Sequence, residues 1–318
     1  MLVSNQKKQV GIPDEIVVKK FPPNWLRSKK TFGWLLLLPT LIVLAVTSVY
    51  PIIYAVYLSL QKWNFGQTDS PQAFVGLGNF TELLSDQRYW SSMWVTIEFL
   101  IFTLPLEFLV GLGMALLLNR TIRGRGFIRA VLLLPIMVSP VVIVLIWKMM
   151  YQVPFGPLNA ILKGLGLIQN DILWLSSPQI AMLAIVIATV WQWYPFSFLV
   201  LSAGLGLVPN DQYEAAAIDG ANRLQVFRNI VWPYLVPSTL VILLIRMMDG
   251  FKTFAIVYSL TNGGPGNSTD LVSYHIYNVG FGGLNVGYGA AMALVLMVVM
   301  VAISLALIGL SRRFRTTS

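Results

Sequence analysis

The sequence contains no cysteine and a single histidine, and only 11% of its 318 residues are charged. Without thiols there is no disulfide framework, and His275 alone cannot build a histidine metal centre or a catalytic dyad. The sequence also has no Gly-Lys dipeptide, which excludes the phosphate-binding loop Gly-x-x-x-x-Gly-Lys-Ser/Thr. We therefore expect no catalytic residues, no metal site and no cofactor bound by this chain.

What the sequence has in abundance is apolar residues, at 56%. A helix that crosses a hydrocarbon core of ~30 Å at ~1.5 Å per residue needs about 20 mostly apolar residues. Because backbone groups in lipid must be satisfied within their own segment, such stretches form helices and not open strands. The sequence predicts an all-α integral membrane protein with a transmembrane domain at 32–310, a tail at 1–31 and a tail at 311–318. Its six predicted transmembrane helices are residues 32–60, 92–118, 127–150, 180–203, 234–260 and 286–310.

The distribution of Lys and Arg predicts the orientation. One set of tails and loops holds sixteen of them, and the opposite set holds only Lys62, Arg88 and Lys163. The side rich in Lys and Arg is normally cytoplasmic, so both termini are predicted to be cytoplasmic. The net charge of +9 does not indicate nucleic-acid binding, because the basic residues lie beside apolar segments and not on a soluble face. The basic set consists of residues 1–30, 119–129, 204–233 and 311–318.

The cytoplasmic loop 209–233 has the pattern of two short helices. Asn210 or Asp211 can cap the first, Gly220 can end it with a positive φ, and Asn222 can cap a second helix that stops before the closing proline. An alanine-rich run leaves one face of the first helix small, so that another protein can approach closely. The loop is therefore predicted to form a helix-turn-helix knob on the cytoplasmic face.

This loop resembles the signature of the membrane-spanning subunits of binding-protein-dependent ABC importers. That signature is Glu-Ala-Ala, a Gly six residues after the Glu, and an Ile-x-x-Pro ending. The matching residues here are Glu214, Ala215, Ala216, Gly220, Ile230 and Pro233, and Asp219 and Ala221 are typical of the carbohydrate branch. The resemblance includes residues 75–80, 115–119, 246–254 and 261–269, whereas Glu107 and Ala255 depart from the pattern.

The resemblance implies a type I ABC importer permease fold, in which this loop is the coupling helix that docks on an ATPase. It implies a prokaryotic cytoplasmic (inner) membrane location, and a sugar, oligosaccharide, polyol or glycerol phosphate as solute. The implied partners are a second homologous permease subunit, two ATP-binding cassette ATPase subunits that bind ATP and Mg, and an extracytoplasmic solute-binding protein.

Polar and aromatic residues inside two predicted spans are candidates for the substrate pathway. Charges in a membrane helix are costly, so they either pair with one another or face a wet cavity. Aromatic rings can stack on the apolar face of a sugar, or they can simply pack against other helices. Both interpretations stay open for these candidates, which are Gln192, Trp193, Tyr194, Arg246, Asp249 and Lys252.

An ion- or proton-coupled secondary carrier is the alternative function. Carriers use membrane-buried carboxylates as relays, and Glu98, Glu107 and Asp249 would supply them. No carrier, however, needs the loop at 209–233. A membrane-embedded enzyme would need a convergent nucleophile, base or metal set, and the sequence offers none. Transport that depends on a separate ATPase and a solute-binding protein distinguishes an importer permease from a carrier.

Overall fold

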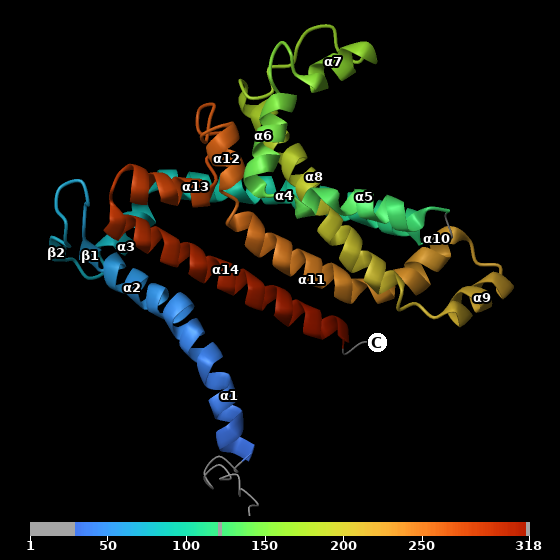
Figure 1. The fold of residues 1–318 in the computed structure, drawn as a ribbon, viewed down its shortest axis with the longest axis horizontal. Coiled ribbons are helices and arrows are strands. Elements are labelled where there is room, and N and C mark those ends of the chain that lie inside the picture. Colours follow the sequence, from blue (N-terminus) through green and yellow to red (C-terminus); the bar gives the residue numbers. More distant parts are fainter. Residues whose placement is uncertain (1–28, 120–122, 316–318) are drawn as a thin grey trace, which may run out of the picture. The chain divides into compact units, whose positions relative to one another are not determined.

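The computed structural model describes residues 29–119 and 123–315 (Figure 1). It divides into two compact units, Met1–Tyr54 and Ala55–Ser318. Most of the predicted N-terminal tail, and residues 316–318 of the C-terminal tail, lie outside the described residues. The all-α prediction is confirmed, with one small addition. Strands β1 (Gln61–Lys62) and β2 (Ala73–Phe74) pair antiparallel, with Gln61 opposite Phe74.

The predicted first span is a continuous helix of α1 (Lys29–Leu44), η2 (Ala45–Val49) and α2 (Tyr50–Ser59). The stretch Gly33–Ser59 is long and apolar enough to cross a membrane. Its middle turn widens to π-helix because Pro51 has no N–H to continue the regular ladder. The N–H of Tyr50 instead donates to the carbonyl of Ala45.

The second unit contains four further unbroken helices that are long and apolar enough to span a membrane: Gln87–Leu118, Pro178–Leu205, Arg223–Phe251 and Val286–Gly309. The first, second and fourth of these confirm the predicted spans 92–118, 180–203 and 286–310. Helices α4 and α8 pack most extensively, and Gly111 lets them approach, because a Cβ there would lie 2.6 Å from the Cβ of Ser197. The helices of the second unit that follow strand β2 are α3 (Gly78–Ser85), α4 (Gln87–Leu118), α5 (Arg125–Met137), α6 (Pro140–Met150), α7 (Pro157–Gly164), α8 (Pro178–Leu205), α9 (Asn210–Ile218), α10 (Arg223–Val226), η3 (Phe227–Val231), α11 (Trp232–Phe251), α12 (Ala255–Leu260), α13 (Val272–Tyr277), η4 (Asn278–Gly282) and α14 (Val286–Arg315).

The predicted third span at 127–150 is bent in the middle. The segment consists of α5 and α6, which meet at 97°. Ser139 precedes Pro140 and has ψ 139°, an extended conformation that the ring of a following proline favours over the helical one. Among the described residues, five helices qualify as spans, and the bent pair makes a sixth if it is counted as one.

The predicted fifth span, 234–260, is also interrupted. Helix α11 ends at Phe251, where the N–H groups of Lys252 and Thr253 turn back to the carbonyls of Asp249 and Gly250. Helix α12 begins only at Ala255 and packs beside α6, as Figure 1 shows. At its other end the span is longer than predicted, since Arg223–Phe251 qualifies as one helix of 29 residues.

Candidate functional site

The predicted helix-turn-helix at 209–233 is present. Helix α9 ends before Gly220, which has a φ of +70°. Helix α10 then starts with a capping box, in which the side chain of Asn222 accepts from the N–H of Gln225 (2.9 Å) and the side chain of Gln225 accepts from the N–H of Asn222 (2.7 Å). Each capping residue satisfies a backbone donor that the first helical turn leaves free. The turn between the two helices is therefore locally specified.

Two details of the loop differ from the prediction. Pro209 occupies the N-cap of α9 without a side-chain hydrogen bond, so neither Asn210 nor Asp211 caps it. The second helix does not stop before Pro233 but continues through η3 into α11 (Figure 1). A proline within the first turn of α11 is tolerated because η3 is a π-turn, in which the N–H of Trp232 donates to the carbonyl of Phe227.

The signature residues form an exposed knob with a shallow groove. Glu214, Ala215, Asp219, Gly220 and Pro233 are exposed, Ala221 and Ile230 are half-buried, and Ala216 is buried. A groove of about 330 Å³ runs between α9 and the start of the long helix, and Ala215, Ala216, Asp219, Ala221 and Ile230 are among its lining residues. The groove confirms that small side chains leave room on this face.

Sequence reasoning missed two exposed apolar residues on the same knob. Ile218 is 86% exposed and Leu224 is 74% exposed, one at the end of α9 and one in α10. Two large apolar side chains therefore lie at the surface on either side of the Gly220 turn. Their places directly before and after the Gly220 turn could have been noticed in the sequence.

The candidate charges in the fifth span form a network with Glu107 of α4. Arg246 donates two hydrogen bonds to Glu107, from Nε (2.8 Å) and Nη2 (2.9 Å), and the two side chains are only 3% and 1% exposed. The guanidinium also lies 4.1 Å from the ring centroid of Trp193. Of the two interpretations kept open for Arg246, its geometry is that of an interhelical ion pair. Glu107, which departs from the family pattern, is its partner.

The other two charges of the network are more accessible. The carboxylate of Asp249 lies 3.6 Å from Nη1 of Arg246 and 3.0 Å from Nζ of Lys252. The side chain of Asp249 is 37% exposed and that of Lys252 is 58% exposed. On the fourth predicted span, Gln192 is buried, while Trp193 and Tyr194 are half-buried. The hydroxyl of Tyr194 donates to the carbonyl of Leu132 (3.1 Å), which joins α8 to α5. The pathway roles of Gln192, Trp193, Asp249 and Lys252 stay predictions.

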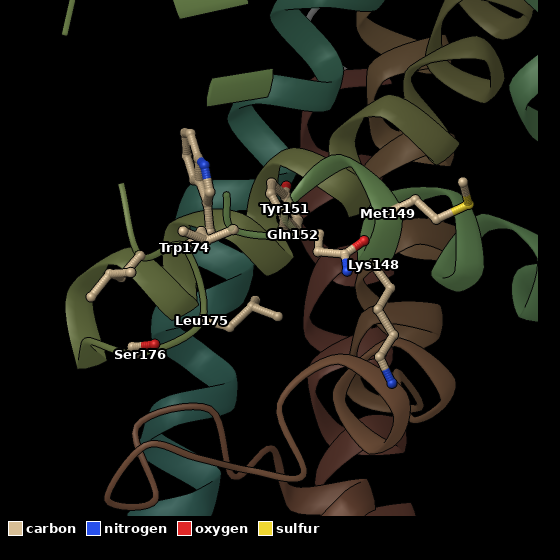
Figure 2. A pocket seen from close by; sticks show the side chains of 9 residues that line it. Lys148, Met149, Tyr151, Gln152, Trp174, Leu175 and Ser176 are labelled. Carbon is tan, nitrogen blue, oxygen red and sulfur yellow. The ribbon is translucent and has the colours of Figure 1, made fainter. Parts of the chain in front are cut away.

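A cavity that the sequence did not predict lies beside the end of α6. It has a volume of about 510 Å³ and lies between α6 and the segment before α8 (Figure 2). Tyr151 and Trp174 form its aromatic side, and each is fixed by a hydrogen bond, to the carbonyl of Ala184 (2.8 Å) and to the side chain of Asn159 (3.0 Å). Among the described residues no group of three or more His, Cys, Asp or Glu could hold a metal ion.

Comparisons with known proteins are consistent across the chain. Residues 107–316 match the family model described as binding-protein-dependent transport system inner membrane component. The chain is 37% identical over 283 residues to the trehalose/maltose transport system permease protein MalF of Thermococcus litoralis, and the alignment covers 88% of this chain and 93% of the relative. It is 36% identical over 283 residues to the sn-glycerol-3-phosphate transport system permease protein UgpA of Agrobacterium fabrum, with 86% and 92% covered.

The fold also has a match among solved structures. One chain of a bacterial alginate ABC transporter, crystallised in complex with alginate pentasaccharide-bound periplasmic protein, has a TM-score of 0.78 and 24% sequence identity. The match covers 91% of this chain and 97% of that chain. At this identity the likeness shows the fold alone.

Proposed function

The chain belongs to the family of binding-protein-dependent transport system inner membrane components, and we propose that it forms half of the translocation pathway of an ATP-driven importer for a sugar or sugar-like solute. It is a multi-pass permease subunit of an ABC importer. The observation that carries the proposal is the exposed helix-turn-helix knob at 209–233, whose residues match the coupling signature and whose second helix is continuous with a membrane span.

We assign the coupling role to the knob for physical reasons. The capping box and the turn at Gly220 give it a fixed shape, and Ile218 and Leu224 offer apolar anchors with Glu214 and Asp219 beside them. Apolar anchors with charged residues nearby are the composition of a protein interface. An ATPase subunit docked here would move α11 when it moves the knob, because no break separates α10 from α11.

The single coupling loop supports the rest of the proposed assembly. One chain with one coupling loop addresses one ATPase subunit, so a second homologous permease and a second ATPase complete the importer. These ATPases bind ATP and Mg. An extracytoplasmic solute-binding protein delivers the solute, and both termini of this chain are cytoplasmic. The solute class follows the relatives, whose names refer to trehalose, maltose and sn-glycerol 3-phosphate; it includes oligosaccharides and polyols.

Asp249 and Lys252 are the best candidates for the pathway within the charge network. Both are partly exposed at the point where α11 ends, and Gln192 and Trp193 belong to α8, which packs against α11. An intramembrane charge that stays accessible indicates contact with water or solute. Arg246 has a different role in this proposal, because its guanidinium is buried between Glu107 and Trp193 and holds α4, α8 and α11 together.

The secondary-carrier alternative is less well supported by this geometry. A proton relay needs a carboxylate that gains and loses its proton as the carrier cycles. Glu107 accepts two hydrogen bonds from an arginine and is almost fully buried, so its charge is already compensated. Glu107, the most deeply buried of the three candidate carboxylates, is therefore paired with Arg246 and is not available as a proton relay.

The proposal is tested with a pair of glycine substitutions that have the same local geometry. Gly220 and Gly166 both have a φ of +70°, and a Cβ on either would have no atom within 4 Å. Valine at each site costs about 1–2 kcal/mol of backbone strain and causes no clash with neighbouring residues. We expect Gly220→Val to re-aim α10, which impairs ATPase binding or uncouples ATP hydrolysis from uptake, whereas Gly166→Val leaves both intact.

The measurements are binding-protein-stimulated ATPase activity, solute uptake and ATPase co-purification in reconstituted complexes. Glu214→Lys, which changes the charge of the knob without backbone strain, is a second coupling variant. Normal values of all three quantities for Gly220→Val and Glu214→Lys would refute the coupling role. Equal losses for Gly166→Val and Gly220→Val would show that strain alone, and not the position of the knob, causes the defect.

A further inference from the structure

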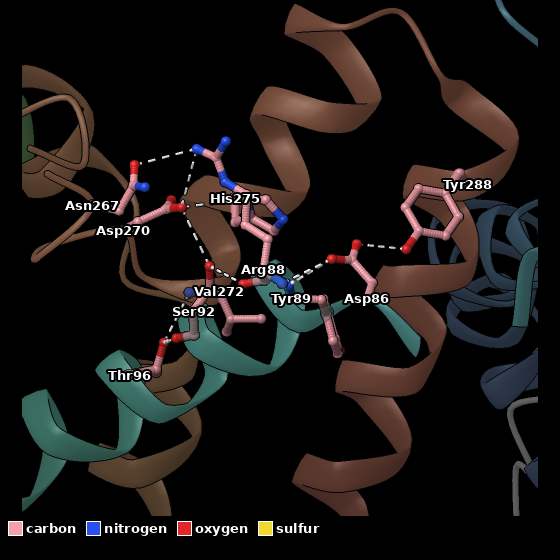
Figure 3. A network of polar contacts seen from close by, with 10 residues as sticks. All are labelled: Asp86, Arg88, Tyr89, Ser92, Thr96, Asn267, Asp270, Val272, His275 and Tyr288. Carbon is pink, nitrogen blue, oxygen red and sulfur yellow. Dashed lines mark hydrogen bonds and ion pairs between the residues drawn. The ribbon is translucent and has the colours of Figure 1, made fainter. Parts of the chain in front are cut away.

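A network of polar side chains joins three helices at one end of the second unit (Figure 3). Asp86 caps α4 by accepting from the N–H groups of Arg88 and Tyr89, and its second oxygen accepts from the hydroxyl of Tyr288 on α14 (2.7 Å). Arg88 in turn lies 3.6 Å from Asp270, in the segment before α13. The loops that carry this network are on the side that the Lys and Arg distribution predicts to be external.

His275 of α13 lies inside this network without completing its hydrogen bonds. Its side chain is only 3% exposed, and Nδ1 is 3.4 Å from the carboxylate of Asp270. Among the described residues neither ring nitrogen of His275 has a hydrogen-bond partner, and the second carboxylate oxygen of Asp270 also lacks one. In Figure 3 the imidazole lies between Asp270 and Asp86. Buried polar groups without partners are rare in native proteins, because leaving them unsatisfied is costly.

The unsatisfied imidazole lines a pocket. The pocket has a volume of about 360 Å³, and its polar lining comes from Asp86, Arg88, His275, Asn278 and Asn285. This volume is within the range of about 300–1,000 Å³ found for small-molecule sites. Amides and imidazoles both donate and accept hydrogen bonds, whereas Arg88 only donates and Asp86 only accepts. The pocket therefore offers donors and acceptors together.

The signs of the charges decide what this pocket can hold. An anion would meet the carboxylate of Asp86, and an organic cation would meet the guanidinium of Arg88. A neutral polyhydroxylated molecule avoids both conflicts, because each hydroxyl donates to a carboxylate or ring nitrogen and accepts from an amide or guanidinium. We propose that this pocket is an outer binding site for the hydroxyl groups of a neutral carbohydrate, distinct from the charge network at Arg246. The inference rests on the proposed function.

The absence of cysteine makes a direct test possible. Val279 lines the pocket and presents no polar group that would bind a sugar, so Val279→Cys reports occupancy without removing a ligand contact. In the complete reconstituted importer we would follow the labelling of this single cysteine by N-ethylmaleimide, with and without trehalose, maltose or sn-glycerol 3-phosphate. Ser70→Cys, on the exposed segment between β1 and β2, is the matched control outside the pocket.

We expect the disaccharide that the importer takes up to slow labelling of Val279→Cys and to leave Ser70→Cys unchanged. Adding His275→Leu should raise about tenfold the sugar concentration that is needed for protection, because the variant loses one hydrogen bond worth about 1.4 kcal/mol.

The outcomes distinguish a failure of the pocket proposal from a failure of the proposed importer function. No ATP-dependent uptake of any of the three solutes by the wild type would count against the proposed function itself. Uptake of a disaccharide without protection of Val279→Cys would overturn the pocket only. Two further results would also overturn it: protection by sn-glycerol 3-phosphate alone, which would show an anion site, and protection by the binding protein without sugar, which would show a protein contact.

Discussion

Replacing Glu107 by leucine would leave the guanidinium of Arg246 buried without its bidentate partner. Removing one member of a buried ion pair typically costs about 3–5 kcal/mol, because the remaining charge stays uncompensated in a medium of low polarity. Here both side chains are at most 3% exposed, so water cannot replace the lost partner. The residual contacts of Arg246, a longer ion pair with Asp249 (3.6 Å) and the ring of Trp193, recover only part of this cost.

The double replacement Glu107→Leu with Arg246→Met removes both charges and keeps similar volumes. Pairs exchanged for apolar residues in this way are often neutral or more stable, and a methionine retains a favourable contact with the ring of Trp193. We therefore expect each single variant to lose folding yield and thermal stability, and the double variant to recover most of both. Asp249→Asn is the matched control, because an accessible carboxylate contributes only about 0–1 kcal/mol.

Fluorescence-detected size-exclusion chromatography after heating measures this double-mutant cycle in the assembled importer. If the pair acts as a unit, the double variant loses much less stability than the sum of the two single losses. Additive losses in the double variant, or a loss for Asp249→Asn as large as that for Glu107→Leu, would refute the assignment of this pair as the packing contact between α4 and α11.

Three further predictions concern packing, pH and orientation. Gly111→Ala should destabilise the protein by about 1–3 kcal/mol because its methyl group would meet Ser197, whereas Gly113→Ala, with nothing within 4 Å, should be neutral or slightly stabilising; thermal unfolding compares the two. Burial opposes ionisation of Asp86, but hydrogen bonds from Tyr288 and two backbone N–H groups hold the pKa of its carboxyl below 3.8. The contribution of this carboxylate to stability is therefore complete above about pH 4 and is lost as the pH falls through the lowered pKa. The stability difference between wild type and Asp86→Asn should therefore shrink on acidification, and a constant difference would contradict this. Ser70→Cys should react with an impermeant maleimide only from outside and Asp211→Cys only from inside, and the reverse pattern would invert the orientation.

The parts of this fold that the sequence predicted are those with local causes. Apolar length located the first, second, fourth and sixth spans to within a few residues, except that the second begins five residues earlier, and Gly220 with Asn222 located the turn of the knob. The break at Ser139 also has a local cause, the proline that follows it, but the apolar run concealed it. At Pro233 the error was the opposite one. The helix was predicted to stop before this proline, but it continues because a π-turn accommodates the proline.

The contacts that the sequence could not predict are those between distant segments. Arg246 and Glu107 are 139 residues apart, and their pairing depends on how α4 and α11 pack. The sequence left open whether Arg246, Asp249 and Lys252 pair or face a wet cavity, and the strongest contact of Arg246 is to a residue outside this set. His275 carried no pattern at all in the sequence. It gained interest only when the structure placed it beside Asp270 and Asp86.

The continuity of α10, η3 and α11 makes this segment a stiff lever. Its 29 residues correspond to roughly 43 Å at ~1.5 Å per residue, with the knob at one end and Arg246 in the last two turns at the other. A push on the knob is therefore expected to arrive as a rotation about the clamp formed by Arg246, Glu107 and Trp193, which acts as a fulcrum. A pivot close to Arg246 makes the movement largest at the knob and small beyond the clamp. The regular hydrogen-bond ladder of the rod is altered at the π-turn before Pro233 and at Pro237 inside α11, so bending is expected at these turns.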